Sequence, residues 1–126
     1  MKDPSKLIAV VDDDESVREA LPDLLREFGF DAIAFDAAEA FLSSDALDRA
    51  CCLILDIAMP GMTGPELQQE LISKGLRIPV IFITAHADAN VRTGLLQKGA
   101  VECLFKPFGD QDLRIALDRA LASRPK

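Results

Sequence analysis

Short apolar runs alternate with segments of helical periodicity along almost the whole chain. Most positions in each run are apolar. Polar residues do not alternate with them, as they would in a strand with one face exposed to solvent. This pattern is typical of strands buried on both faces of a parallel sheet. The runs, and therefore the five strands that we predict, are 7–11, 32–35, 52–55, 80–84 and 101–105, of which 32–35 is the weakest.

The segments between these runs carry apolar residues at the i, i+3, i+4 and i+7 spacing of an amphipathic helix. The first spans 17–28 and ends at Gly29, and Pro22 inside it should kink the helix or cost one backbone hydrogen bond. A short helix around Ala40 and Phe41 has Asp36 as its candidate N-cap. Three more helices are expected: one from Gly64-Pro65 to Gly75, one over 88–98 that Asn90, Thr93 and Gly94 weaken, and a last one with apolar residues from 113 to 121.

Five βα units predict an α/β fold, a (βα)5 doubly wound parallel sheet in which right-handed crossovers place helices on both faces. The result is a three-layer sandwich. We find no internal repeat, low-complexity tract or interdomain linker, so we expect one domain over 1–126 with a core from about residue 6 to residue 122.

The composition and charge of the chain limit its expected cellular location and the kinds of binding partner. The chain has 14 basic and 21 acidic residues, a net charge of -7, which argues against a nucleic-acid surface and against an anionic membrane. The apolar stretch at 7–11 is too short for a signal peptide or a membrane span. Cys51, Cys52 and Cys103 form an odd set without C-x-x-C spacing, so we expect buried reduced thiols and a cytoplasmic protein.

Polar residues follow four of the five predicted strands. Strand one ends in Asp12-Asp13, strand three in Asp56, strand four in Thr84 and strand five in Lys106, whereas strand two ends at Phe35. Each has an ordinary explanation alone, such as a helix N-terminus, a strand end or a surface lysine. Together they would meet at the edge where open α/β sheets bind ligands.

If strands one and three are neighbours, Asp12, Asp13 and Asp56 converge. Two carboxylates about 4 Å apart repel by roughly 4 kcal/mol at an effective dielectric of about 20, so such a site raises a pKa or binds a cation. Oxygen ligands in an open pocket suit Mg²⁺. With Thr84 and Lys106 nearby, this set also suits phosphoryl transfer, in which Asp56 can act as a nucleophile.

Four segments resemble the response-regulator receiver domain of two-component systems, in the CheY-like superfamily, over essentially the whole chain. They are IAVVDDDESVR (8–18), LILDIAMPGMTG (53–64), PVIFITAHAD (79–88) and GAVECLFKPF (99–108). The ITAHAD loop and the last segment also hint at the FixJ-like branch. The resemblance implies the flavodoxin-like strand order 2-1-3-4-5, which makes strands one and three neighbours.

The resemblance also implies roles for individual residues. Asp56 matches the phosphoacceptor, and Asp12 and Asp13 match the acidic pair that holds Mg²⁺ (or Mn²⁺), Asp13 directly and Asp12 through water. The backbone carbonyl of Ala58 matches the third protein ligand. Thr84 matches the switch hydroxyl and Lys106 the active-site lysine, and the peptide bond between Lys106 and Pro107 is expected to be cis.

Two positions depart from the family pattern. Receivers usually carry Tyr or Phe where this chain has Cys103, and Phe105 lies on the same face of the strand, so it is either a substitute switch residue or a packed aromatic. Ala58 and His86 follow Asp56 and Thr84 by two residues and match positions that line the path of the attacking water. His86 either orients that water or contacts the phosphoryl group, or is an exposed loop histidine.

We therefore expect a phosphorylation switch and not an enzyme with turnover. A sensor histidine kinase or a phosphotransfer protein would donate a phosphoryl group to Asp56, the chain would change shape at the fourth helix, strand five and the fifth helix, and it would later hydrolyse its own acyl phosphate. A phosphorylation-dependent homodimer is a further expectation. No output segment follows residue 122, so the domain is free-standing, acting on a downstream protein, or cut from a longer regulator with an output domain.

Two other functions remain open. The first is an aspartyl phosphatase on a related fold, but such enzymes usually show a second acid two residues after the nucleophile, where this chain has Ala58. The second is a binding module that keeps the fold and is never phosphorylated. The absence of a Gly-rich loop after strand one argues against a nucleotide- or flavin-binding protein.

Overall fold

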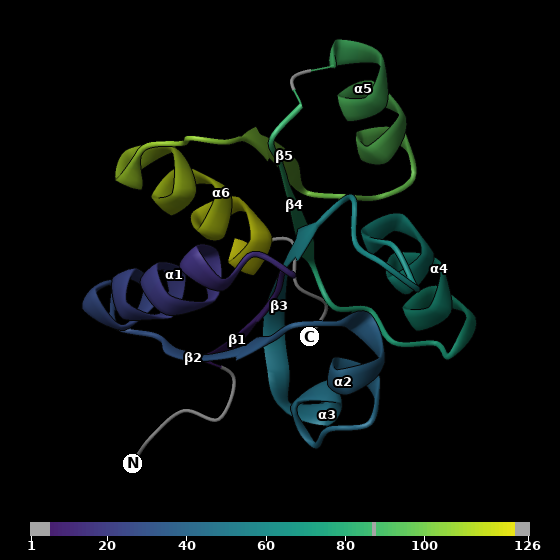
Figure 1. The fold of residues 1–126 in the computed structure, drawn as a ribbon, viewed down its shortest axis with the longest axis horizontal. Helices are drawn as coiled ribbons and strands as arrows, with labels where there is room; N and C mark the ends of the chain where they lie inside the picture. Colours follow the sequence, from purple (N-terminus) through teal and green to yellow (C-terminus); the bar gives the residue numbers. More distant parts are fainter. Residues whose placement is uncertain (1–5, 87, 123–126) are drawn as a thin grey trace.

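A computed structural model describes residues 6–86 and 88–122. It contains a five-stranded sheet whose adjacent strands are all parallel, in the order β2-β1-β3-β4-β5 (Figure 1), which confirms the predicted fold class and strand order. The strands are β1 (Leu7–Val11), β2 (Asp31–Phe35), β3 (Ala50–Asp56), β4 (Val80–Thr84) and β5 (Glu102–Phe105).

Helices cover both faces of this sheet, as the alternating pattern predicts. They are α1 (Glu15–Glu27), α2 (Ala38–Leu42), α3 (Ala46–Arg49), α4 (Gly64–Ser73), α5 (Ala89–Gln97) and α6 (Asp110–Ala122). Figure 1 shows α1 and α6 on one face and α2, α3, α4 and α5 on the other. None of the helices in the described ranges combines the length and the apolar composition needed to cross a membrane.

Two apolar clusters hold these layers together. Successive strand residues enter opposite clusters: Ala9 and Val11 of β1 pack with α2 to α5, whereas Ile8 and Val10 pack with α1 and α6. Every residue of β1 and of β4 is buried, which explains why their sequences are continuous rather than alternating. The three cysteines are buried and form no disulfide in the described part of the chain, which agrees with the expectation.

The element boundaries differ from the sequence-based expectation in several places. Asp36 does not cap α2: the N-cap is Ala37, and no side chain caps the helix. The chain stays extended at Ala37, so the helix begins one residue too late for Asp36 to reach it. The sequence does not predict helix α3, because four residues are too few to show a helical periodicity. Helix α1 continues through Pro22, which removes one backbone hydrogen bond without ending the helix.

Candidate functional site

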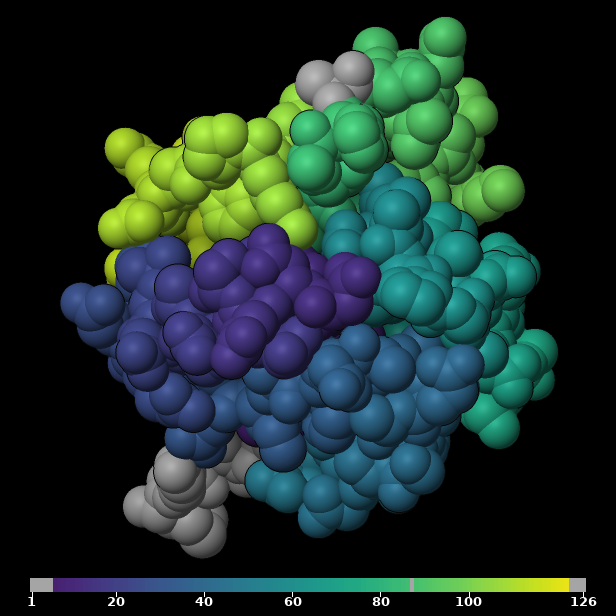
Figure 2. Space-filling model, in the orientation of Figure 1, coloured from purple at the N-terminus to yellow at the C-terminus, as the bar shows by residue number. Residues whose placement is uncertain are grey.

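The carboxyl edge of the sheet brings the three predicted aspartates together. Val11 of β1 pairs with Leu55 of β3, so Asp12 and Asp56 leave neighbouring strands at the same level. Asp12, Asp13 and Asp56 each offer a carboxylate oxygen, and these oxygens lie within 4.8 Å of one another. In Figure 2 the purple chain that leads into α1 lies against the teal chain that follows β3. The predicted convergence is confirmed.

Asp12 is the buried anchor of this cluster. Its side chain is fully buried, and both of its oxygens have partners: Oδ1 accepts from the backbone N–H of Asp14 at 2.9 Å, and Oδ2 pairs with Nζ of Lys106 at 2.9 Å. Its backbone carbonyl accepts from Nη1 of Arg18 at 3.1 Å. Helix α1 therefore helps to hold the turn that presents Asp12 and Asp13.

Lys106 reaches the cluster from the end of β5. Its backbone N–H donates to the carbonyl of Thr84 at 2.7 Å, and the Lys106–Pro107 peptide bond is cis, as the resemblance implies. Burial by itself would lower the pKa of Lys106, but the hydrogen bond and the charge of Asp12, with the charge of Asp56, raise it above its usual value. The lysine is therefore a fixed cation in the site.

Asp56 ends β3 with 8% of its surface exposed. Burial and the neighbouring Asp12 carboxylate raise the pKa of Asp56 to about 7, while Lys106 partly opposes the rise. One ammonium facing three carboxylates leaves the cluster short of positive charge. Carboxylate oxygens grouped in this way are the ligands that Mg²⁺ or Mn²⁺ takes in proteins, so the residues present fit the predicted metal.

The loop after Asp56 is held by close backbone contacts. The N–H of Ile57 donates to Ile83 at 3.2 Å, and its carbonyl accepts from Gly64 at 3.1 Å. A Cβ at Gly64 would clash with the carbonyl oxygen of Asp56 and press on the Phe82 ring, so only glycine fits. Ala58 lies exposed on this loop, two residues from Asp56.

Thr84 lies at the end of β4 with its hydroxyl already engaged. Its Oγ1 accepts from the backbone N–H of His86 at 3.1 Å, which ties the strand to the loop that leads to α5. Thr84 itself is buried, whereas His86 is exposed. The structure therefore brings Thr84 to the carboxyl edge and places His86 on the solvent side of the following loop.

Cys103 and Phe105 share one face of β5. Both pack against the cluster formed with α2 to α5, Cys103 buried and Phe105 half-buried, so the predicted strand alternation is confirmed. Burial raises the pKa of the Cys103 thiol, which favours its neutral form. Position 103 is therefore a small packed residue in place of a mobile aromatic ring.

Several supporting residues were missed from the sequence. Thr63 and Glu66 form a reciprocal capping box at the start of α4, which the T-x-x-E spacing could have revealed. Glu102 of β5 pairs with Arg92 of α5 at 2.6 Å and with Arg119 of α6 at 3.2 Å. No local signal marks that cluster, because its three members come from three separate elements.

Comparison with known proteins agrees with this geometry. Residues 8–118 match the family model described as the response regulator receiver domain. The chain is 41% identical to the response regulator protein TmoT of Ectopseudomonas mendocina, covering 100% of this chain and 57% of the relative. It is 40% identical to nodulation protein W of Bradyrhizobium diazoefficiens, covering 93% of this chain and 50% of that protein. The chain thus spans about half the length of the curated relatives it matches.

Two solved structures share the fold. FixJ-N superposes with a TM-score of 0.86 at 35% identity, over 100% of this chain and 99% of that one. The response regulator StyR superposes with a TM-score of 0.84 at 44% identity, over 94% of this chain and 60% of that one. The FixJ-like resemblance found in the ITAHAD loop is therefore matched by a FixJ relative of similar length.

Proposed function

Because this chain belongs to the family of response regulator receiver domains, we propose that it accepts a phosphoryl group on Asp56 within a two-component phosphorelay. The observation that carries the proposal is the grouping of Asp56 with Asp12 and Asp13 on neighbouring strand ends, beside the ammonium of Lys106. A buried carboxylate that keeps one exposed edge can act as a nucleophile while its neighbours hold a cation.

The transfer step needs a phosphohistidine donor, on a sensor histidine kinase or a phosphotransfer protein. A carboxylate oxygen of Asp56 attacks the phosphorus, a P–O bond forms, and the P–N bond breaks with its electron pair returning to the histidine nitrogen. The ammonium of Lys106 stabilises the negative charge on the phosphoryl oxygens during this step. The product is an acyl phosphate on Asp56.

The metal would be held by Asp13, Asp56 and the backbone carbonyl of Ala58. Asp12 would act through water, as the family resemblance implies, while its two oxygens accept from the N–H of Asp14 and pair with Lys106. When bound, Mg²⁺ supplies positive charge that neutralises the phosphoryl oxygens and orients the donor. The role of this chain is to present carboxylate oxygens at the strand ends and a backbone carbonyl on the loop that follows β3.

The conformational response would begin at Thr84. Its hydroxyl hydrogen is available for a phosphoryl oxygen, and movement of Thr84 would draw in the loop whose His86 N–H it already holds. The motion would reach α5, β5 and α6, the fourth helix, fifth strand and fifth helix of the sequence-based scheme. Asn90, Thr93 and Gly94 make α5 a weak helix, which favours its rearrangement.

Phe105 is our candidate substitute for the aromatic switch residue that Cys103 replaces. It lies on the same face of β5 and is half-buried against the cluster formed with α2 to α5. A Phe105 ring whose NMR signals stay unchanged on phosphorylation would rule this role out. The output, through a downstream protein, an attached domain or a homodimer, is part of the same proposal, since the curated relatives are about twice as long.

The decisive experiment is incubation with acetyl phosphate and Mg²⁺, followed by intact-mass measurement. The wild-type chain should gain about 80 Da, the mass of one phosphoryl group, and Asp56→Asn should gain nothing. Asp48→Asn, which changes an exposed carboxylate outside the acidic cluster, is the matched control and should gain the same mass as wild type. An equal gain in Asp56→Asn would place the phosphoacceptor elsewhere and defeat the proposal.

A further inference from the structure

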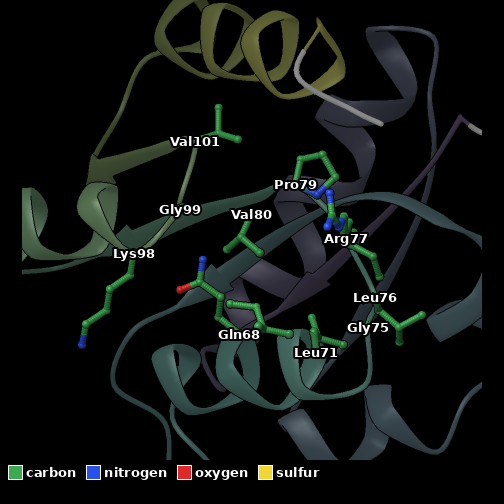
Figure 3. Close-up of a pocket in the computed structure, with 12 residues that line it drawn as sticks. Gln68, Leu71, Gly75, Leu76, Arg77, Pro79, Val80, Lys98, Gly99 and Val101 are labelled. Carbon is green, nitrogen blue, oxygen red and sulfur yellow. The ribbon is translucent and has the colours of Figure 1, made fainter. Parts of the chain in front are cut away.

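A cavity of about 510 Å³ lies at the opposite edge of the sheet from Asp56, between α4 and the segments that lead into β4 and β5 (Figure 3). Its walls are mainly apolar, formed by Leu71, Ile78, Val80 and Val101 among others. The volume falls within the range of small-molecule sites, which are largely apolar with a few placed polar groups. The cavity shares no residue with the phosphoacceptor site.

One polar side chain points into this cavity. Gln68 of α4 is only 5% exposed, and Figure 3 shows its amide directed from the helix toward Val80 and Gly99. Within the described ranges, the side chain of Gln68 has no hydrogen-bond partner. Every fully enclosed polar side-chain atom in those ranges does have a partner, so the Gln68 amide is not fully enclosed by protein. The amide therefore meets the cavity itself, and a ligand in that space could satisfy its donor and its acceptor.

The charges around the cavity are of one sign. Its charged lining residues are Arg77 and Lys98, and neither forms an ion pair with a described carboxylate. Of the two acids on α4, Glu70 is engaged by Lys74 at 3.8 Å and Glu66 accepts from the backbone N–H of Thr63 in the capping box. In a chain with a net charge of -7, a lining that holds two cations and no acid favours an anionic ligand.

We propose that this cavity binds a small organic anion with an apolar body. The apolar part packs against Leu71, Val80 and Val101, and the amide of Gln68 hydrogen-bonds the bound molecule. Arg77 and Lys98, exposed on opposite sides of the rim, attract its anionic group through their charge. A small ligand suits the site better than a protein segment, because a volume of about 510 Å³ with a single buried amide matches a small-molecule pocket and not a wide interface. This site is additional to the proposed function and does not depend on it.

The test is a titration of the ¹⁵N-labelled chain with octanoate, followed by NMR. We expect saturable shifts of the Gln68 side-chain amide signals and of the backbone signals of Val80 and Gly99. Octylammonium, which has the same apolar body and the opposite charge, should bind at least about tenfold more weakly, as expected when a charge-assisted contact is lost. Shifts that do not saturate, or that centre elsewhere, overturn the proposal.

Two variants distinguish the contribution of the Gln68 amide to octanoate binding from that of the rim charge. Gln68→Leu keeps the size and removes the amide, and the exposed pair Arg77→Gln with Lys98→Gln removes the rim charge; each should weaken octanoate binding by about tenfold. Arg26→Gln, which removes an exposed cation on α1 outside the lining, is the matched control and should bind as wild type does. If Gln68→Leu fails to fold, the rim variant still tests whether the cavity binds an anion. Unchanged affinity in the rim variant, or equal binding of octylammonium, contradicts an anion site.

Discussion

The ammonium of Lys106 lies 2.9 Å from Oδ2 of Asp12, joining residues that are 94 positions apart in the sequence. The Asp12 side chain is fully buried, whereas 19% of the Lys106 side chain is exposed. The pair therefore fastens the end of β5 to the end of β1 and compensates a carboxylate that solvent does not reach.

Replacement of Lys106 by Met should destabilise the chain, because it leaves the Asp12 carboxylate buried without a cation. We expect the free energy of unfolding to fall by roughly 2–4 kcal/mol in urea titrations at pH 7.5 with a chelator present. The double variant Asp12→Asn with Lys106→Met should lose less than the sum of the two single losses. Strict additivity in this cycle would show that the pair contributes no coupling.

The stability of the metal-free chain should depend on the protonation of Asp56. Its pKa rises from 3.8 to about 7 in the folded chain, so the folded state binds this proton more tightly than the unfolded state does. The resulting stabilisation is fully present below pH 3.8 and is lost as the pH rises toward 7. In a chelator, Asp56→Asn should therefore be more stable than wild type at pH 8, by roughly 1–3 kcal/mol.

This difference between Asp56→Asn and wild type should shrink steadily as the pH falls from 8 to 4, because the neutral acid resembles the amide. Asp48→Asn, which lies outside the acidic cluster, should show no such trend. Mg²⁺ should stabilise wild type at pH 8 more than Asp56→Asn, since the variant lacks one charged ligand. A difference that does not vary with pH would contradict the raised pKa.

Gly64 and Gly94 should respond oppositely to alanine. A Cβ at Gly64 meets the backbone carbonyl of Asp56, which cannot move without disturbing the site, so Gly64→Ala should lose about 2 kcal/mol or more. Nothing lies within 4 Å of a Cβ at Gly94 in α5, so Gly94→Ala should gain about 0.5–1 kcal/mol of stability. Thermal melts of both variants test this pair, and equal effects would refute the steric account.

His86→Ala tests the histidine beside the switch threonine. If the imidazole orients the attacking water, the acyl phosphate of the variant should decay more slowly, by about tenfold or more. The measurement is loss of the phosphorylated mass with time after acetyl phosphate is removed. Asp88→Asn, a nearby change that alters only the N-cap of α5, is a suitable comparison. An unchanged decay rate would make His86 an exposed loop residue without this role.

Glu102→Gln should loosen the contact of β5 with α5 and α6. Its side chain pairs with Arg92 and with Arg119, and we expect the free energy of unfolding to fall by about 1–2 kcal/mol. Arg119→Gln should cost less than Arg92→Gln, because 62% of the Arg119 side chain is exposed. Asp45→Asn breaks an exposed pair with Arg49 and should change stability little. Equal effects of Asp45→Asn and Glu102→Gln would remove the special role of Glu102.

Local patterns predicted the α/β fold class of this chain and the polar residues at its strand ends, whereas the strand order and the residue roles came from the family resemblance. Strands buried on both faces must be apolar at every position, so 7–11 and 80–84 are visible in the sequence alone. The carboxyl ends of parallel strands share one edge, so Asp12, Asp56 and Thr84 could be assigned to one site before any coordinates existed. The short helix α3 and the N-cap of α2 could not be predicted, because a few residues are too few to show such a pattern.

Only the tertiary structure decided which partners these residues have. From its position after β5, Lys106 could have paired with Asp56 or with Asp12. The packing of the strand ends places its ammonium against Asp12. The close approach of Gly64 to Asp56, the two arginines on Glu102 and the amide of Gln68 inside a cavity likewise depend on how separate elements pack. Sequence periodicity reports what each segment buries, whereas contacts between distant segments arise only when the layers are assembled.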